Sequence, residues 1–239
     1  MKQRLDKALT ERGIVSSRSQ AENFIKLGSV MVDTTIVTKP GFLVSEHNQI
    51  TLTAKEQYVS RAGLKLASVA MVLGVSFDGT TVLDVGSSTG GFTDYALQHG
   101  AAKVFAVDVG TDQLHPSLRN DPRIELHEKT DIRDFIPPEI PDIVVIDVSF
   151  ISLREILPHI SNSIGPDTVV VAMVKPQFEA GRQDVHKGVI KNDSLRRRIL
   201  TDFELWAKQR FVILDKRDSD VAGTKGNRER FYLLKNTLQ

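Results

Sequence analysis

The stretch TVLDVGSSTGGFT, residues 81–93, constrains the fold of this chain more than any other segment. Residues that favour β structure flank an acid, Asp84, and a glycine-rich turn follows them. This pattern is typical of a strand followed by a turn and a helix N-terminus that together bind a nucleotide-type ligand. A dinucleotide fingerprint, G-x-G-x-x-G, needs a glycine two positions after Gly86, where this chain has Ser88. The missing glycine argues against a pyrophosphate and leaves open which nucleoside the turn would hold.

The chain from Arg61 onward alternates between segments with strand character and segments with helix character. Apolar and β-branched runs predict strands at 81–86, 103–110, 123–128, 142–150, 168–176, 211–217 and 228–235. Helical periodicity predicts helices at 64–75, 91–99, 151–160 and 192–209. This alternation predicts an α/β fold with a mainly parallel, doubly wound sheet, and the last two strands are expected to form an antiparallel pair at its end.

Residues 1–53 are expected to form a separate, smaller unit. Two short amphipathic helices end at Gly13 and Gly28, and short strands follow them. The polar segment AKEQYVS, residues 54–60, is the expected linker to a second domain at 61–239. The predicted architecture is therefore a small α+β domain ahead of a larger α/β domain.

Composition is that of an ordinary soluble globular protein and restricts the partners. The chain has 41% hydrophobic and 26% charged residues, a net charge of +1 and no cysteine, so affinity for nucleic acid would have to come from charge clustered on one face. The six histidines lack metal-ligand spacing, and no metal is expected. No apolar run approaches the roughly 20 residues of a membrane-spanning helix, and the charged start lacks the apolar core of a signal peptide. We therefore expect a cytoplasmic protein.

Five basic residues of the first unit are candidates for a phosphate-binding surface: Arg4, Arg12, Arg18, Lys26 and Lys39. They would form such a surface if they converged on one face. Acidic residues lie between them, so an ordinary solvated surface explains the same pattern equally well. The sequence leaves both interpretations open.

Acids at the carboxyl ends of the predicted strands suit an adenosine that carries no phosphate. Asp84 ends the first strand, and Asp108 ends the second, at the spacing at which an acid accepts hydrogen bonds from both ribose hydroxyls. Asp131 follows the third strand, where a carboxylate could meet an adenine amino group. S-adenosylmethionine is the common cofactor of this kind, and its candidate contacts are Asp84, Gly86, Ser88, Gly90, Gly91, Phe92, Asp108 and Asp131. The alternative is that the turn is only a tight strand-to-helix connection.

Four ionisable residues stand where packing alone does not require them. Lys65 interrupts an apolar helical pattern, and Glu229 begins the last predicted strand. Asp147 and Lys175 each end an apolar strand. Because a buried charge without a partner is costly, these residues should either reach solvent or pair with one another. A single charged residue at such a position is more often a solvated residue at the end of a strand. Four charged residues that converge on one edge of the sheet would instead form a reactive site.

These residues match a known family. Lys65, Asp147, Lys175 and Glu229, together with DVGSSTGGF, resemble the K-D-K-E tetrad of FtsJ-type RNA 2′-O-methyltransferases. The segments SRAGLKL, TVLDVGSSTGGFTD, FAVDVG, LRNDPRI, VVIDVSFISL, VKPQFEAGR and GNRE resemble the TlyA family in order and context. RLDKALTERGIVSSRSQAENFIKLGSV is similar to the S4 RNA-binding domain that precedes the methyltransferase in that family. The resemblance covers nearly the whole chain.

The resemblance implies a Rossmann-like class I methyltransferase that uses S-adenosylmethionine to methylate a ribose 2′-hydroxyl, typically of a cytidine, in ribosomal RNA. It implies ribosomal RNA or a ribosomal subunit as the partner, and neither DNA nor a membrane. A ribose hydroxyl must lose its proton as it is methylated, and Lys175 is the expected general base. Asp147 and Glu229 would orient the Lys175 amine.

Basic residues near the predicted pocket mouth extend this expectation. Arg182, Lys187 and Lys191 follow the PQFEAG segment and are candidates for phosphate contact. The run from Arg196 to Arg198 is instead predicted to be a solvated helix face, because helical spacing scatters three consecutive side chains around the axis.

Three alternative functions stay open. The family also carries an older label of haemolysin, which would imply a membrane-active protein, although no strongly amphipathic cationic helix is found in the sequence. An RNA-binding protein with an inactive methyltransferase fold is the second alternative, and the intact tetrad counts against it. A small-molecule or protein methyltransferase is the third, and the S4-like segment counts against that one. The oligomeric state is left open.

Overall fold

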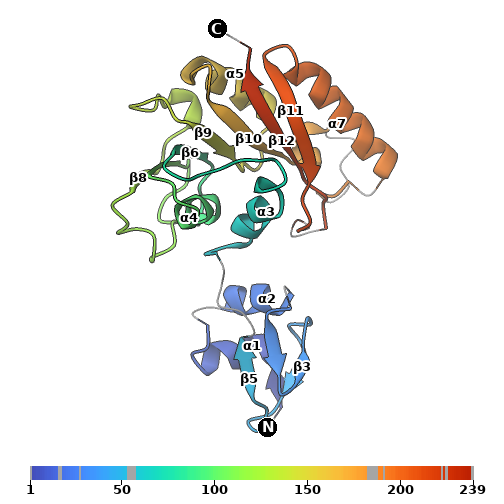
Figure 1. The fold of residues 1–239 in the computed structure, drawn as a ribbon. Helices are drawn as coiled ribbons and strands as arrows, with labels where there is room; N and C mark the ends of the chain where they lie inside the picture. The colour runs from blue at the N-terminus through green and yellow to red at the C-terminus, as the bar shows by residue number, and fades with distance from the viewer. Residues whose placement is uncertain are drawn as a thin grey trace. The chain divides into compact units, whose positions relative to one another are not determined.

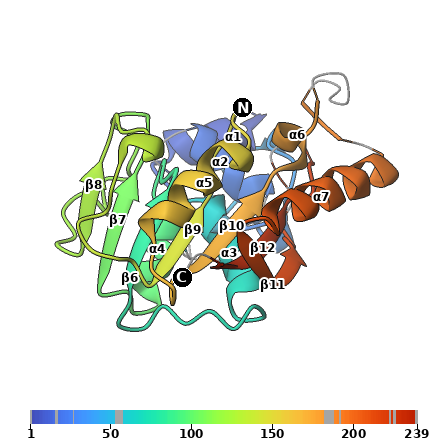
Figure 2. The same ribbon diagram turned by 90° about the horizontal axis from the view of Figure 1, so that it is seen from above.

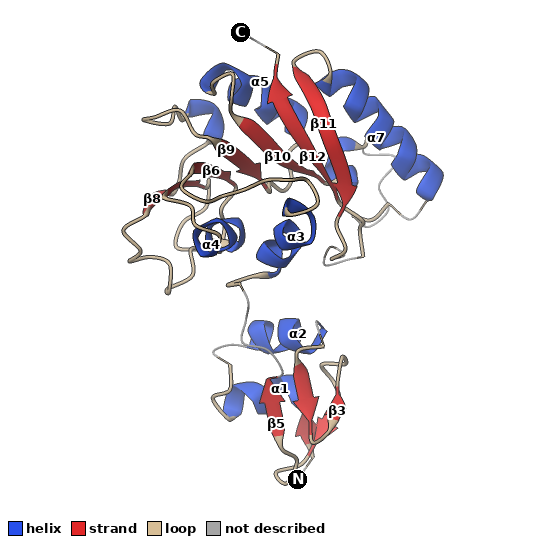
Figure 3. Cartoon of the chain, viewed as in Figure 1, coloured by secondary structure: helices blue, strands red, loops and turns tan. Residues whose placement is uncertain are grey.

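A computed structural model of the chain describes residues 2–15, 18–26, 28–52, 58–181, 188–190, 192–221, 223 and 226–237. The chain divides into two compact units, Met1–Gln57 and Tyr58–Gln239 (Figure 1). Each unit has its own hydrophobic core. The first combines two helices with short strands, and the second is built on one large sheet (Figure 3).

Helices and short strands share the core of the first unit. Its elements are β1 (Gln3–Arg4), α1 (Leu5–Glu11), α2 (Arg18–Lys26), β2 (Val30–Val32), β3 (Thr35–Ile36), β4 (Leu43–Val44) and β5 (Ile50–Leu52). β2 pairs antiparallel with β3 and with β5, and β1 pairs antiparallel with β4. Leu5 and Leu9 of α1 and Ile25 of α2 are fully buried, because apolar residues at helical spacing face the same side of each helix.

A seven-stranded sheet with the order β11-β12-β10-β9-β6-β7-β8 forms the centre of the second unit. Its strands are β6 (Thr81–Val85), β7 (Lys103–Val107), β8 (Ile124–His127), β9 (Ile143–Ile146), β10 (Val169–Val174), β11 (Phe211–Asp218) and β12 (Arg230–Asn236). β6 to β10 are parallel, and β12 runs antiparallel to β10 and β11. The predicted mainly parallel, doubly wound sheet with a final antiparallel pair is confirmed.

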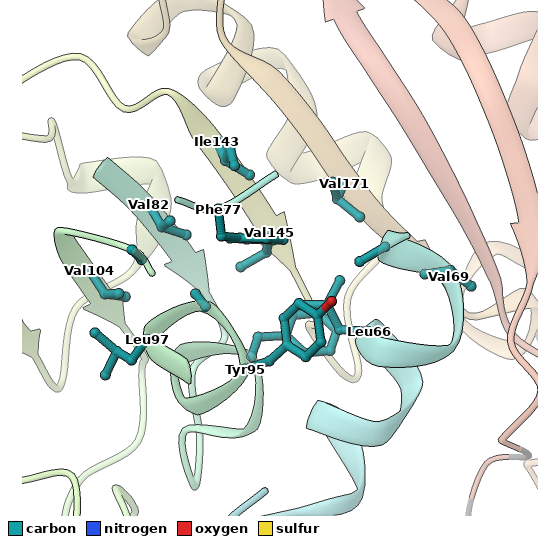
Figure 4. Close-up of a cluster of buried hydrophobic side chains, with 14 of the residues drawn as sticks. Leu66, Val69, Phe77, Val82, Tyr95, Leu97, Val104, Ile143, Val145 and Val171 are labelled. Carbon is teal, nitrogen blue, oxygen red and sulfur yellow. The ribbon is translucent and has the colours of Figure 1, made fainter. Parts of the chain in front are cut away.

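Helices cover both faces of this sheet (Figure 2). α3 (Arg61–Ala70) and α4 (Gly91–Gln98) pack on one face, and Figure 4 shows Leu66 of α3 and Tyr95 of α4 in the same apolar cluster as Val145 and Val171 of the strands. α5 (Leu153–Ser163) and α7 (Asp193–Ala207) pack on the other face. The sequence does not predict the 3-10 helix η1 (Ile132–Asp134) or α6 (Pro176–Glu179), because neither is long enough to show periodicity.

The segment before α3 belongs to the second unit. Tyr58 is buried, and its ring centroid lies 5.3 Å from that of Tyr95. Val59 donates its backbone N–H to Asp94 Oδ2 at 2.7 Å. The linker prediction is therefore wrong for residues 58–60, because long-range packing leaves no periodic pattern in the sequence; residues 54–57 lie outside the described part of the chain. α3 also begins three residues before its predicted start and ends at Ala70 rather than Val75.

Candidate active site

A cleft lies at the carboxyl ends of the parallel strands, where the strand order reverses beside β6. In doubly wound sheets this switch point is where ligands bind. The cleft has a volume of about 390 Å³, and a polar recess of about 140 Å³ adjoins it. Gly86, Ser88, Asp147 and Ser149 line both spaces. A ligand in the cleft and a group in the recess would therefore contact the same four residues.

The glycine-rich turn after β6 forms one wall of the cleft. Gly86 has a φ of +80°, and a Cβ on it would lie 2.9 Å from the carbonyl oxygen of Asp147, so a side chain does not fit there. Ser88 has a φ of +47° and donates its backbone N–H to Asp108 Oδ2 at 2.8 Å. The turn is thus held in shape by the acid that ends the neighbouring strand.

Gly90 and Gly91 of the same turn do not line the cleft or the recess. A Cβ on Gly90 would lie 2.6 Å from the side chains of Leu114 and Leu118, and a Cβ on Gly91 would lie 2.7 Å from that of Ala62. Both glycines allow close packing behind the turn. The next residue does line the recess: Phe92 is buried, and its ring centroid lies 6.1 Å from that of Phe231.

Asp84 lines the recess from the end of β6 and is fully buried. Its Oδ2 accepts a hydrogen bond of 2.6 Å from Thr93 Oγ1, whereas its Oδ1 has no hydrogen-bond partner among the described residues. Burial raises the pKa of the Asp84 carboxyl to about 7, although the Thr93 hydrogen bond lowers it. A buried carboxylate oxygen without a partner in the wall of a recess is suited to a cationic amino group.

Asp108 and Asp131 line the cleft itself. Besides its bond to the turn, Asp108 accepts a hydrogen bond of 2.6 Å from Gly110 N. Asp131 caps η1 and binds the Arg133 guanidinium through both carboxylate oxygens, at 3.0 and 2.7 Å. The hydrogen bonds from Arg133 lower the pKa of Asp131 to about 2, so this carboxylate stays ionised throughout the neutral range.

The four tetrad residues form two ion pairs. Lys65 Nζ lies 2.5 Å from Glu229 Oε2, and Lys175 Nζ lies 2.5 Å from Asp147 Oδ1. Both lysines and Glu229 are buried, and the Asp147 side chain is 16% exposed. Lys175 Nζ also donates a hydrogen bond of 2.8 Å to Ser149 Oγ. The four charged side chains therefore pair with one another. Because an unpaired buried charge is costly, pairing or contact with solvent was expected for them, and pairing is what the structure has.

The register of the sheet explains this arrangement. β10 and β12 pair antiparallel up to Val174 and Arg230, so Lys175 and Glu229 are the next positions of the same register. Asp147 directly follows β9, the parallel neighbour of β10. Three of the four residues therefore stand at one edge of the sheet, and the remaining lysine reaches Glu229 from α3.

Sequence reasoning missed three residues at this site. Ser149 contacts Lys175, and Gln113 accepts a hydrogen bond of 2.9 Å from Ser88 Oγ. Phe150 has a φ of +67° and is 91% exposed, and its ring centroid lies 5.3 Å from that of Phe178. Ser149 and Phe150 lie in the segment VVIDVSFISL. This segment resembles the family, but the resemblance indicates no chemical role for these two positions.

Three of the predicted basic residues of the first unit, Arg4, Arg12 and Arg18, have partners within the fold. Arg4 and Arg18 both bind the fully buried carboxylate of Asp6, at 2.8 and 3.0 Å, and their hydrogen bonds lower its pKa to about 2. Arg12 donates to two backbone carbonyl oxygens before β5, each at 2.8 Å. Lys39 is exposed. These arginines help to fold the unit, which is an explanation that the sequence did not suggest.

Other basic candidates are only partly visible. The Lys26 side chain and residues Arg182, Lys187 and Lys191 lie outside the described part of the structure. Arg196 is buried, and its Nη2 lies 2.8 Å from Asp218 Oδ1. The prediction of a solvated face is therefore wrong for Arg196, because an acid from a distant strand binds it.

The cleft and the recess have the groups that S-adenosylmethionine requires. The oxygen of Asp84 that has no partner among the described residues suits an ammonium group, and the Asp108 and Asp131 carboxylates along the cleft suit hydroxyl and amino donors. Apolar side chains, among them Ile132 and Ile156, also line the cleft and suit the faces of a base.

Comparison with known proteins gives consistent matches over both units. The model of the FtsJ-like methyltransferase family matches residues 58–237, and that of the S4 domain matches residues 3–50. Hemolysin A of Brachyspira hyodysenteriae is 39% identical over 95% of this chain and 97% of its own. The 16S/23S rRNA (cytidine-2′-O)-methyltransferase TlyA of Mycobacterium tuberculosis is 38% identical over 97% of this chain and 89% of its own.

A solved structure from Streptococcus thermophilus, described as a "putative hemolysin", has a TM-score of 0.77 and 36% identity to this chain, and it covers 100% of this chain and 90% of that one. The names of the similar proteins thus divide between haemolysin and ribosomal RNA methyltransferase. Within the residues that the structure describes, no helix is long and apolar enough to cross a membrane.

Proposed function

This chain belongs to the FtsJ-like methyltransferase family and carries an S4 domain ahead of the methyltransferase domain, and from that premise we propose that it methylates a ribose 2′-hydroxyl of ribosomal RNA with S-adenosylmethionine. The mycobacterial relative is named for a reaction of this kind. The observation that carries the proposal is the ion pair between the buried Lys175 and Asp147 in the recess beside the cleft. RNA binding alone does not require a buried lysine amine beside a nucleoside-sized cleft, whereas proton transfer from a ribose hydroxyl does require a base there.

We assign the cofactor to the cleft and the recess. When bound, S-adenosylmethionine supplies an electrophilic methyl group on a positively charged sulfur. Asp84 would accept a hydrogen bond from its amino group, Asp108 from its ribose hydroxyls and Asp131 from its adenine amino group. Each carboxylate oxygen has two lone pairs, so the backbone and Arg133 contacts of the latter two acids leave acceptor capacity for a ligand.

We assign Lys175 as the general base. A ribose hydroxyl is a weak nucleophile at neutral pH, so its proton must leave as its oxygen is methylated. Lys175 Nζ would accept that proton and must be unprotonated at that moment. Asp147, 2.5 Å away, would hold the amine in place and stabilise the ammonium that forms. The Lys65–Glu229 pair, at the adjoining register position, would fix the edge of the recess and join α3 to the start of β12.

The first unit would bind the RNA. Arg4 and Arg18 retain exposed side-chain surface, 50% and 59%, while they bind Asp6, so their remaining N–H groups are open to phosphates. Lys39 is exposed on the same unit.

Four further basic residues are proposed to contact phosphates on the basis of their charge and position in the sequence. They are Arg12 and Lys26 of the first unit and Arg182 and Lys187 of the second. The target is proposed to be a cytidine, as in the name of the mycobacterial relative.

The test is transfer of labelled methyl from S-adenosylmethionine to intact ribosomes, to separated ribosomal subunits and to bare ribosomal RNA. Nuclease digestion of the labelled RNA then identifies the nucleoside, and the expected product is a 2′-O-methylated cytidine. Lys175→Ala is run in parallel and should leave no label. A wild-type protein that binds the cofactor and labels no RNA would overturn the proposal.

A further inference from the structure

The Lys175 amine contacts two oxygen atoms on one loop. Asp147 Oδ1 forms an ion pair with Nζ at 2.5 Å, and Ser149 Oγ accepts a hydrogen bond from Nζ at 2.8 Å. Ser149 lies outside the family tetrad and two residues along the chain from Asp147. Ser149 is exposed, so packing does not require its hydroxyl to stand beside the lysine.

Two oxygen atoms constrain a lysine amine more than one does. An unprotonated amine has two N–H bonds and one lone pair in a tetrahedral arrangement. The hydrogen bond to Ser149 Oγ fixes the direction of one N–H and leaves two directions for the second N–H and the lone pair. The Asp147 carboxylate, 2.5 Å from Nζ, attracts the second N–H, so the lone pair takes the direction that is left. We infer that Ser149 is a positioning residue that, together with Asp147, leaves the third tetrahedral direction of Lys175 Nζ for the ribose hydroxyl. This inference rests on the proposed function.

The loop that carries Ser149 is itself attached to the segment that carries Lys175. Glu179 of α6 accepts hydrogen bonds from Ser152 Oγ at 2.6 Å and from Leu153 N at 2.8 Å. The Glu179 side chain is almost fully buried, and burial raises its pKa. α6 begins directly after Lys175, so this contact fixes the loop relative to the lysine at a second point.

Steady-state kinetics of the full chain tests the inference. Ser149→Ala removes the hydroxyl that accepts the hydrogen bond from Nζ, and the expected result is a fall in kcat of about tenfold, the scale of one lost hydrogen bond, with unchanged KM values for cofactor and RNA. Ser149→Thr keeps a hydroxyl and should restore kcat. Ser194→Ala is the matched control, because Ser194 is also exposed and accepts a hydrogen bond from a basic residue, Arg197 at 3.3 Å, on α7. A kcat of Ser149→Ala equal to that of the wild type would overturn the inference and leave the proposed function intact.

A second measurement does not depend on methyl transfer. Solvent exchange of the Lys175 Nζ hydrogens, followed by NMR of the protein without cofactor or RNA, reports directly on the hydrogen bonds of the amine. We expect faster exchange in Ser149→Ala, and wild-type exchange in Ser149→Thr and Ser194→Ala. Equal exchange in all four proteins would reject Ser149 as a partner of the amine, even if no RNA substrate were found. Failure of the wild type to label RNA, by contrast, would overturn the proposed function and with it the catalytic meaning of the contact.

Discussion

Thr93 Oγ1 donates a hydrogen bond of 2.6 Å to Asp84 Oδ2, and both residues are fully buried. The bond joins the end of β6 to the first turn of α4 across the glycine-rich turn. It leaves the other carboxylate oxygen of Asp84 without a partner among the described residues. The carboxyl that lines the recess therefore has a defined orientation and a pKa, raised by burial to about 7, that makes its charge sensitive to pH near neutrality.

Cofactor binding should depend on the ionisation of Asp84. If the carboxylate binds the amino group of S-adenosylmethionine, affinity should fall about tenfold for each pH unit below the Asp84 pKa and level off above it. Isothermal titration calorimetry between about pH 5.5 and pH 8.5 measures this. Asp84→Asn should bind more weakly and lose the pH dependence. The same dependence in Asp84→Asn would show that another group is responsible.

The raised pKa of Asp84 also has a consequence for folding. The folded state keeps a proton that an unfolded chain releases near the ordinary pKa of 3.8. The contribution of Asp84 to the free energy of unfolding should therefore fall as pH rises from about 4 to about 7 and stay constant above that. Urea unfolding of the wild type and of Asp84→Asn at several pH values compares the two slopes, and identical slopes would contradict the burial of an ionisable carboxyl here.

Lys175 and Asp108 should have separable roles. Lys175→Ala is expected to lower methyl transfer by at least about 100-fold, the scale of general-base catalysis, with cofactor affinity nearly unchanged. Asp108→Ala should instead weaken cofactor binding by about tenfold or more, because it removes a ligand acceptor and also the acceptor of Ser88 N. Kinetics and calorimetry on both variants separate the effects. Equal loss of cofactor binding in the two variants would reject this division.

Asp6 should be a principal stabilising residue of the first unit. Removing the buried carboxylate that Arg4 and Arg18 share should cost on the order of 2 kcal/mol. Amide hydrogen exchange of Asp6→Ala in the full chain should show lost protection in α1 and α2, with α5 unchanged as the internal control. Because the pKa of Asp6 is lowered from 3.8 to about 2, its stabilisation should be complete above about pH 4 and disappear as pH falls through about 2. Unchanged protection of α1 in the variant would contradict this assignment.

RNA binding should respond to charge on the first unit. Neutralising Lys26 and Lys39 together should reduce the steepness of the log–log salt dependence of RNA binding by about 1.4 to 1.8, since each phosphate contact contributes about 0.7 to 0.9. Lys235→Gln is the control, because Lys235 stands at the opposite end of the β10–β12 register from the recess. An unchanged slope in the double variant, or an equal change in the control, would remove these two lysines from the RNA-binding surface.

Most of the fold could be predicted because its signals are local. Apolar β-branched runs mark β6, β9 and β10, helical periodicity marks α5 and α7, and the glycine turn marks the strand-to-helix connection at the switch point. Once the strands are parallel and alternate with helices, their carboxyl ends share one edge of the sheet. For that reason Asp84, Asp147 and Lys175 could be expected near one another from sequence alone.

The partner of each charged residue could not be predicted, because the choice depends on elements that are distant in sequence. Arg18 binds Asp6 rather than solvent, Arg196 binds Asp218, and Glu179 binds the start of α5. None of these contacts produces a periodic pattern in the sequence. The same charged residues would be equally compatible with a solvent-exposed surface.

Turn chemistry and periodicity act over a few residues, so the order of strands and helices, and the placing of these charged residues at one edge of the sheet, can be predicted from the sequence alone. The pairing within the tetrad, Lys65 with Glu229 and Lys175 with Asp147, and the contact of Ser149 with the second pair are seen only in the folded chain. Ion pairs and hydrogen bonds form over about 3 Å, and such distances depend on strand register and loop shape, which no short stretch of sequence specifies.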